Sequence, residues 1–186
     1  MLIVSNTEKS LAYFMEVLSQ EPLKEIIIVS GCEEARQLML ARCFDLCVIN
    51  TPLSDGFGEK LAIEAAARGA CQVILVVRAE LFDEVSERVG ASGVFAIPKP
   101  MGKGVFANSV HLARAAFAKV SALRGENERL LQQIEDLRVI DRAKCLLVSC
   151  LRMTEPEAHR YLEKQAMDMR TTRLTVAQGV IRTYEN

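Results

Sequence analysis

The sequence predicts an α/β domain with a doubly wound, five-stranded parallel sheet, followed by a long helix and a small helical domain. Three observations carry this prediction: short apolar runs that alternate with helical patterns, an uninterrupted helical stretch behind them, and two further helical patterns near the end. Half of the 186 residues are hydrophobic and none is Trp, so the core is expected to be mainly aliphatic. This length accommodates one full domain and a small second one.

Five short apolar runs predict the strands. They lie at 2–4, 26–29, 46–49, 73–77 and 94–97, and apolar spacings of three and four residues predict helices between them at 8–18, 33–41, 58–67 and 81–89. Continuously apolar strands are typical of a parallel sheet that is covered on both faces. Strict alternation of strand and helix gives a doubly wound sheet, and five strands fit the flavodoxin-like order.

A helical pattern then continues from about Val105 to about Leu151. Its middle carries apolar residues in steps of three and four, the a and d positions of a heptad repeat: Val120, Leu123, Asn127, Leu130, Ile134 and Leu137. Leu at every d position, with Asn127 at an a position, favours a parallel two-stranded coiled coil. A lone amphipathic helix packed on its own domain would show similar spacings, but it would seldom place Asn in the seam. We therefore expect a homodimer.

Two more helices are predicted after this one. Thr154-Glu155-Pro156-Glu157 has the pattern of a capping box, with Pro tolerated in the first turn. Thr171 or Thr172 is expected to cap the last helix. Together with the end of the long helix they form a three-helix unit of about 50 residues, whose core is marginal when it folds alone.

Charge and cysteine usage narrow the class of protein. Residues 1–137 carry 14 Lys/Arg against 18 Asp/Glu, whereas residues 138–186 carry 9 against 6, which directs any phosphate-rich partner to the C-terminal part; a solvated helical surface would show a similar excess. The six scattered cysteines predict reduced core thiols. Met1 leads directly into an apolar run, and no run approaches the length that spans a bilayer, so a cytoplasmic protein without membrane partners is expected.

Three segments resemble the receiver domain of response regulators in two-component systems. They are Leu2–Asn6, Phe44–Gly56 and Ile97–Pro100, and the resemblance covers roughly residues 1–120. In that family an acidic pair after the first strand holds Mg²⁺, and an Asp after the third strand accepts a phosphoryl group. A Ser or Thr ends the fourth strand, and a Lys ends the fifth.

Of that set, only the lysine is present. The positions that match the family's phosphorylation residues are Ser5, Asn6, Asn50, Val77 (or Arg78) and Lys99. Phosphoryl transfer needs an anionic nucleophile and a cation that neutralises the developing charge, and these residues offer Mg²⁺ no carboxylate. Asp55 fits a turn better than it fits a substitute acceptor.

We therefore expect a degenerate site with no catalytic residue, metal or cofactor, in which Lys99 bonds Asn50 or a backbone carbonyl. Such a domain would be switched by a regulatory protein, by a ligand, or not at all.

Residues 138–182 resemble the ANTAR domain, a transcription-antitermination module of some response regulators. The matching segments are Val139–Leu147, Thr154–Leu162, Ala166–Arg170 and Leu174–Ala177, and Cys145 stands where the family usually has Gly. The resemblance implies binding to structured RNA leaders, typically paired hairpins. Four basic residues near helix ends or on the non-apolar face could pair with phosphates or stack on loop bases, although each could equally be a solvated surface charge: Arg142, Lys144, Arg170 and Arg173.

The predicted function is phosphorylation-independent transcription antitermination by a dimer that binds structured RNA. The expected domains are 1–118 (receiver-like), 119–138 (coiled coil) and 139–186 (ANTAR). A DNA-binding regulator is the first alternative, disfavoured because the turn at 169–172 lacks Gly and the helix after it has few base-reading side chains. A non-catalytic interaction scaffold is the second. No enzyme is expected, because the sequence has no nucleophile–base pair, metal cluster or phosphate-binding Gly loop.

Overall fold

The computed structural model describes residues 1–19, 25–69 and 71–185 and divides into two compact units, Met1–Ser121 and Ala122–Asn186. In the first unit strands and helices alternate: β1 (Leu2–Val4), α1 (Glu8–Leu18), β2 (Ile27–Val29), α2 (Cys32–Ala41), β3 (Leu46–Asn50), α3 (Glu59–Ala67), β4 (Gln72–Arg78), the short 3₁₀ turn η1 (Ala79–Leu81), α4 (Phe82–Gly90) and β5 (Phe95–Lys99). Each predicted strand and helix of this unit is present, with bounds shifted by at most two residues.

All five strands are parallel, in the order β2-β1-β3-β4-β5. This is the flavodoxin-like order, so the predicted fold class is confirmed. The order reverses between β1 and β3, and side chains at the carboxyl ends of these strands therefore meet at one edge of the sheet, where α/β proteins usually place their sites.

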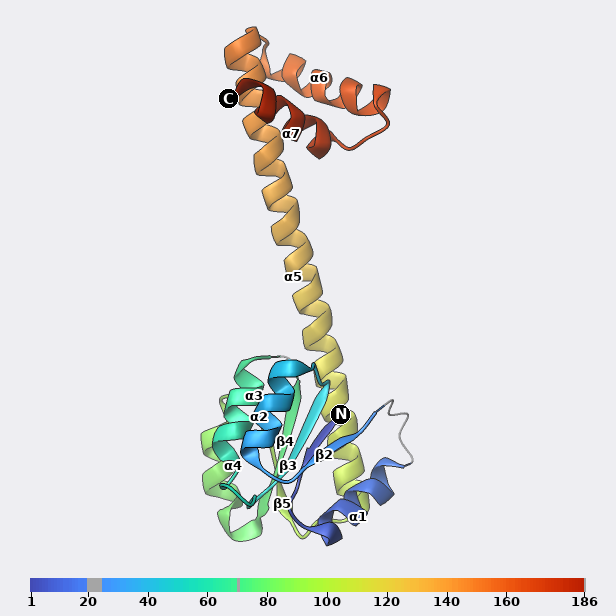
Figure 1. The fold of residues 1–186 in the computed structure, drawn as a ribbon, viewed down its shortest axis with the longest axis vertical. Coiled ribbons are helices and arrows are strands. Elements are labelled where there is room, and N and C mark those ends of the chain that lie inside the picture. Colours follow the sequence, from blue (N-terminus) through green and yellow to red (C-terminus); the bar gives the residue numbers. More distant parts are fainter. Residues whose placement is uncertain (20–24, 70, 186) are drawn as a thin grey trace. The chain divides into compact units, whose positions relative to one another are not determined.

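Helices cover both faces of the sheet (Figure 1). On one face α2, α3 and α4 pack on alternate strand residues, with Leu75 and Val77 fully buried among them. On the other face α1 and the start of α5 (Lys103–Leu151) do the same, and Phe14 and Phe106 fill the space between them. Both faces being covered explains why the strands read as continuously apolar.

The second unit is helical. Its core joins the end of α5 to α6 (Glu155–Asp168) and α7 (Arg173–Tyr184), and small residues at the contacts let the helices approach closely: Ala143, Ala158, Ala166 and Ala177. The capping box at the start of α6 is present, with the Glu157 carboxylate accepting from the Thr154 amide at 2.8 Å. Thr172, one of the two predicted caps, accepts from the Thr175 amide and begins α7.

The turn between α6 and α7 closes without glycine. Arg170 has a φ of 52°, in the left-handed region that favours Gly. Two backbone bonds hold it there, from the Arg170 amide to the Met167 carbonyl and from the Thr171 amide to the Ala166 carbonyl. These are the bonds of a Schellman motif, so the turn satisfies the helix end at the cost of strain at Arg170.

The prediction that all the cysteines lie in the core is wrong for half of them. Cys32, Cys47 and Cys71 are buried, whereas Cys43, Cys145 and Cys150 are exposed free thiols. Cys145 and Cys150 lie on α5 and Cys43 lies in the loop between α2 and β3. All three read like core residues in sequence, because the thiol is small and apolar. No helix among the described residues combines the length and apolarity that a membrane span requires.

Candidate functional site

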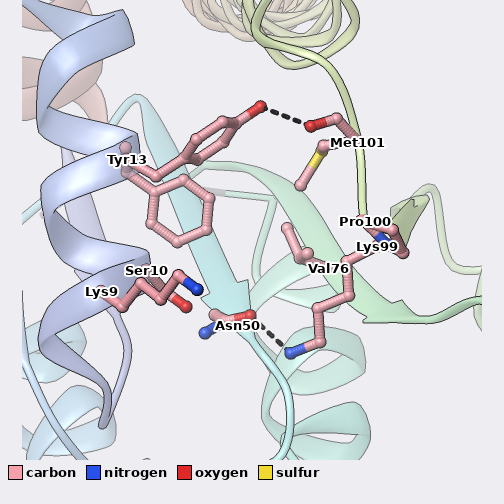
Figure 2. Close-up of a pocket in the computed structure, with 9 residues that line it drawn as sticks. Lys9, Ser10, Tyr13, Asn50, Val76, Lys99, Pro100 and Met101 are labelled. Atoms are coloured by element: carbon pink, nitrogen blue, oxygen red, sulfur yellow. Dashed lines mark hydrogen bonds between the residues drawn. The ribbon is translucent and has the colours of Figure 1, made fainter.

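Three side chains of the degenerate phosphorylation site meet at the carboxyl edge of the sheet, and Figure 2 shows two of them, Asn50 and Lys99. Lys99, the last residue of β5, donates from Nζ to Asn50 Oδ1 at 2.9 Å and also to the Thr51 carbonyl. Asn50, the last residue of β3, donates from Nδ2 to the Ser5 hydroxyl at 3.1 Å. The structure therefore brings Ser5, Asn50 and Lys99 into one chain of hydrogen bonds. We expected Lys99 to bond Asn50 or a backbone carbonyl, and it bonds both.

This chain of bonds is neutral except at the lysine. Ser5 and Asn50 are buried, and each has its polar side chain occupied by a neighbour. Burial, followed by the nearby Arg78 charge, lowers the pKa of Lys99, because no carboxylate compensates its desolvation. The described residues contain no cluster of three or more His, Cys, Asp or Glu that could hold a metal ion.

The other two matched positions lie apart from this chain of bonds. Asn6 is exposed just after β1. Val77 is fully buried in β4, opposite Pro98 of β5, and packs in the core on the face of α2 to α4. Thr51, which sequence reasoning missed, is buried beside Asn50 and donates its hydroxyl to the Val76 carbonyl at 3.0 Å. Its place directly after Asn50 was the available signal.

Asp55 has a structural role. Its two carboxylate oxygens accept from the amides of Cys32 at 2.7 Å and Glu33 at 3.0 Å, at the N-terminus of α2. A Cβ on Gly31 would lie 2.8 Å from the carboxylate, so glycine is needed for this close approach. These backbone bonds lower the pKa of Asp55. The carboxylate is thus the cap of α2, in keeping with its predicted place in a turn.

A cavity of about 250 Å³ opens beside the lysine, between α1 and the ends of β3 and β5 (Figure 2). It is lined by Lys9, Ser10, Tyr13, Phe14, Asn50, Val76, Lys99, Pro100 and Met101. The Tyr13 hydroxyl donates to the Met101 carbonyl at 3.1 Å and bridges α1 to the segment before α5. Sequence reasoning did not find this cavity, because its walls come from four segments that only the fold brings together.

Three of the four predicted RNA-binding residues form ion pairs within the second unit. The Arg142 guanidinium binds Glu185 through two nitrogens, and Arg173 lies 3.4 Å from Glu163. Lys144 lies 2.8 Å from Asp141 and 2.9 Å from Glu155, and bonds to these two carboxylates raise its pKa. Arg170, at the strained turn, is exposed.

The predicted dimer seam is uncovered in the single chain. Val120, Leu123, Leu130, Ile134 and Leu137 are between 42% and 61% exposed, and every residue from 120 to 135 is exposed. A row of apolar side chains at heptad spacing, with Asn127 within it, is thus available to a partner.

Comparison with known proteins identifies the two parts of the chain. Residues 128–181 match the ANTAR domain family, a match that starts within the heptad and ends inside α7. The transcriptional regulatory protein PdtaR of Mycobacterium tuberculosis is 27% identical over 168 residues, which are 90% of this chain and 82% of that protein.

Solved structures share the fold of the front unit. The signal receiver domain of a Luxo repressor protein from Vibrio parahaemolyticus has a TM-score of 0.59 at 18% identity, covering 66% of this chain and 94% of that one. A receiver domain from Pseudomonas fluorescens Pf-5 gives 0.58 at 17% identity, covering 65% and 90%. The response regulator StyR gives 0.65 at 12% identity over 98% of both chains. At such identities the likeness is one of fold.

The front unit therefore has a receiver fold, and residues 128–181 behind it match the ANTAR domain family. The chain's output domain is an ANTAR domain, and its curated relative is a transcriptional regulator. The resemblance found in the sequence is confirmed. The domain boundaries and the roles of the individual site residues stay predictions.

Proposed function

We propose that this protein is a phosphorylation-independent, non-enzymatic regulator of transcription antitermination. It binds structured leader RNA as a dimer, through its C-terminal helices, in the cytoplasm where nascent transcripts are made. The observation that carries the proposal is the ANTAR match over residues 128–181, which includes all of α6 and most of α7. The relative PdtaR is a transcriptional regulatory protein, which supports a role in transcription for this chain as well.

Independence from phosphorylation is supported by the chemistry at the sheet edge. Asn50 at the acceptor position is not a nucleophile at neutral pH, and its amide is already bonded to both Ser5 and Lys99. Mg²⁺ prefers carboxylate and phosphate oxygens, which Ser5 and Asn6 do not supply. The input to the front unit is then a protein contact or a ligand.

Dimerisation is supported by the seam. Burying exposed Leu side chains contributes roughly 1.5–3 kcal/mol each, and a second copy of the same helix offers a matching row. Asn127 can pair with its counterpart only in a parallel arrangement in register. Two copies of the ANTAR domain would bind two hairpins of one RNA. Binding of the first hairpin would then raise the effective concentration of the second hairpin at the other ANTAR domain.

RNA contact is assigned to Arg142, Lys144, Arg170 and Arg173. The Lys144 side chain is only 17% exposed, whereas those of Arg142 and Arg173 are 64% and 49% exposed. Exposed ion pairs such as those of the two arginines are weak, on the order of 1 kcal/mol or less. A phosphate, which offers more acceptor oxygens and more charge, can therefore take these side chains over from their carboxylates.

The test is binding of the full chain to the leader of its own operon, as RNA and as duplex DNA, at two salt concentrations. RNA binding should be tight and salt-sensitive, and Lys144→Ala/Arg173→Ala should reduce the salt slope, by less than about 2 because each lost phosphate contact had also freed a carboxylate that takes up a cation. Lys60→Ala/Arg68→Ala, in the front unit, is the control and should leave binding unchanged. Binding to DNA alone would favour a DNA-binding regulator, and binding to neither would favour a scaffold.

A substitution at Arg170 separates the effect of its charge on RNA binding from its effect on stability. Arg170→Gly relieves the left-handed backbone, so stability should be kept or raised while RNA affinity falls. Arg152, which precedes α6 with a φ of 55°, provides the matched control. Arg152→Gly removes the same charge and the same strain at a turn outside the assigned surface, and it should retain binding. Equal losses in both variants would argue against Arg170 as a contact.

A further inference from the structure

The cavity beside Lys99 combines two ammonium groups with an apolar wall. Lys99 and Lys9 line it, from β5 and α1, and Figure 2 shows the Lys99 amine bonded to Asn50. None of the residues that line it is acidic. The cavity therefore carries a positive charge with no carboxylate of its own to balance it.

Lys99 has capacity for one more acceptor. Its ammonium group has three N–H donors, and two are taken by Asn50 Oδ1 and the Thr51 carbonyl, both uncharged oxygens. Within the described part of the chain no ion pair involves Lys9. A partly buried ammonium that is solvated only by neutral oxygens gains most from an anion placed beside it.

The opposite wall is apolar and held in place. Tyr13 is fixed by its bond to the Met101 carbonyl, and its ring lies 5.7 Å from Phe14 and 6.0 Å from Phe106 between centroids. Met101 lies along the same wall. Small-molecule sites are largely preformed concavities of this kind, with few polar groups to orient the ligand, and about 250 Å³ is below the range for drug-sized ligands.

We propose that this cavity binds a small organic monoanion. Its anionic group pairs with Lys99 and Lys9, and its apolar body lies against Tyr13 and Met101. The loss of the receiver acids has left the site suited to an anion, where the family holds a cation. Binding at this site can be measured on the full chain without RNA, so its outcome does not depend on whether the chain binds RNA.

The experiment uses the full chain and benzoate as the probe, with benzamide as its neutral analogue and benzylammonium as its cationic one. Saturation-transfer difference NMR gives the affinities, and the methyl resonance of Met101 reports the location. We expect benzoate to bind at least about tenfold more tightly than either analogue, as for a hydrogen bond between charged groups, and to shift Met101.

Three variants test the charge. Lys99→Met should weaken benzoate at least about tenfold, and Lys99→Arg should restore most of the affinity. Asn50→Asp supplies a counter-ion at the 2.9 Å contact and should weaken benzoate similarly, without a change of side-chain size. Lys60→Met, which changes an exposed lysine of α3, should have no effect.

If Lys99→Met fails to fold, Lys9→Met takes its place as the variant that removes a charge. Lys9 is exposed and makes no contact with the core in the described part of the chain. Equal binding of benzoate and benzamide, no shift at Met101, or full affinity in Asn50→Asp would overturn the proposal.

Discussion

Asn50 and Asp55 lie five residues apart at the end of β3 and after it, and their side chains have different roles. Asn50 is buried and links Ser5 to Lys99, whereas Asp55 is outside the sheet and caps α2. A carboxylate that is consumed by two backbone amides is poorly placed to attack a phosphoryl donor, and an amide has no nucleophilic oxygen at neutral pH.

Restoring the acceptor alone should not restore phosphorylation. Asn50→Asp replaces the amide by a carboxylate, but Ser5 and Asn6 still offer no carboxylate to Mg²⁺, so the developing charge stays without its cation. Incubation with acetyl phosphate and Mg²⁺, followed by intact-mass spectrometry, should show no stable phosphate. If stable phosphate appeared in this variant, the missing metal carboxylates would not be what prevents phosphorylation.

The cap formed by Asp55 has a pH-dependent signature. Its pKa is lowered in the folded chain, so the stability it provides is present above the ordinary pKa of aspartate and is lost as the pH falls through the lowered value. Asp55→Ala should reduce the melting temperature at pH 7 by roughly 2–8 °C, and the difference from the parent chain should shrink below about pH 4.

Circular dichroism melts at several pH values measure this, with Asp45→Ala as the control, because Asp45 is exposed and its side chain caps no helix in the described structure. A difference that stays constant with pH would mean that the carboxylate charge is not what holds α2.

At the scale of the element, α5 is buried at both ends and exposed in its middle. Its first turns are buried against the sheet through Phe106, Val110 and Ala113, and its last turns join the helical core through Ala143 and Leu147. Between these, the heptad positions have no cover from the described chain. In the proposed dimer a second copy of the helix covers the apolar residues there.

Charges placed in the seam should separate the dimer. Leu123→Lys/Leu130→Lys removes two d-position side chains from each chain, and from the burial of Leu we expect the dimer dissociation constant to rise by at least on the order of 1,000-fold. Light scattering after gel filtration should give twice the 20.6 kDa chain mass for the parent and one chain mass for the variant. Ser121→Glu, at an outward position of the same helix, should stay dimeric; a monomeric parent chain would exclude the coiled coil.

At the scale of the whole molecule, the cysteines report which surfaces are open. Under native conditions iodoacetamide should label Cys43, Cys145 and Cys150 but not Cys32, Cys47 and Cys71. Burial raises the pKa of Cys71 to about 11 and that of Cys47 well above its usual range, so both lack thiolate as well as access. Peptide mapping with and without denaturant checks the pattern. Native labelling of Cys47 would contradict the sheet core.

Sequence reasoning predicted the elements well because their signals are local. Continuous apolar runs gave the parallel strands, the heptad spacing gave the seam, and Thr154 with Glu157 gave a cap three residues across. The Lys99–Asn50 bond was also predictable, because carboxyl ends of neighbouring parallel strands meet at one edge.

Contacts between distant segments were not predictable in this way. The bond from Asp55 to α2 spans 22 or 23 residues, and the pair of Arg142 with Glu185 spans 43. Tyr13 and Met101 are 88 residues apart. Such pairs depend on how faces are brought together, and the spacing of residues along the chain carries no signal of it.

The carboxylates that hold Arg142, Lys144 and Arg173 affect how this protein would choose among polyanions. In the proposed RNA complex each phosphate contact made by these three residues must displace a glutamate or aspartate, and each freed carboxylate takes up a cation from solution. The net number of ions released is then smaller than the number of contacts. Weakly or irregularly charged polymers therefore gain little free energy by binding. Only a ligand whose phosphates lie opposite several of these basic residues at once replaces the ion pairs that binding breaks. The protein's own carboxylates therefore make binding selective for the spatial arrangement of the phosphates.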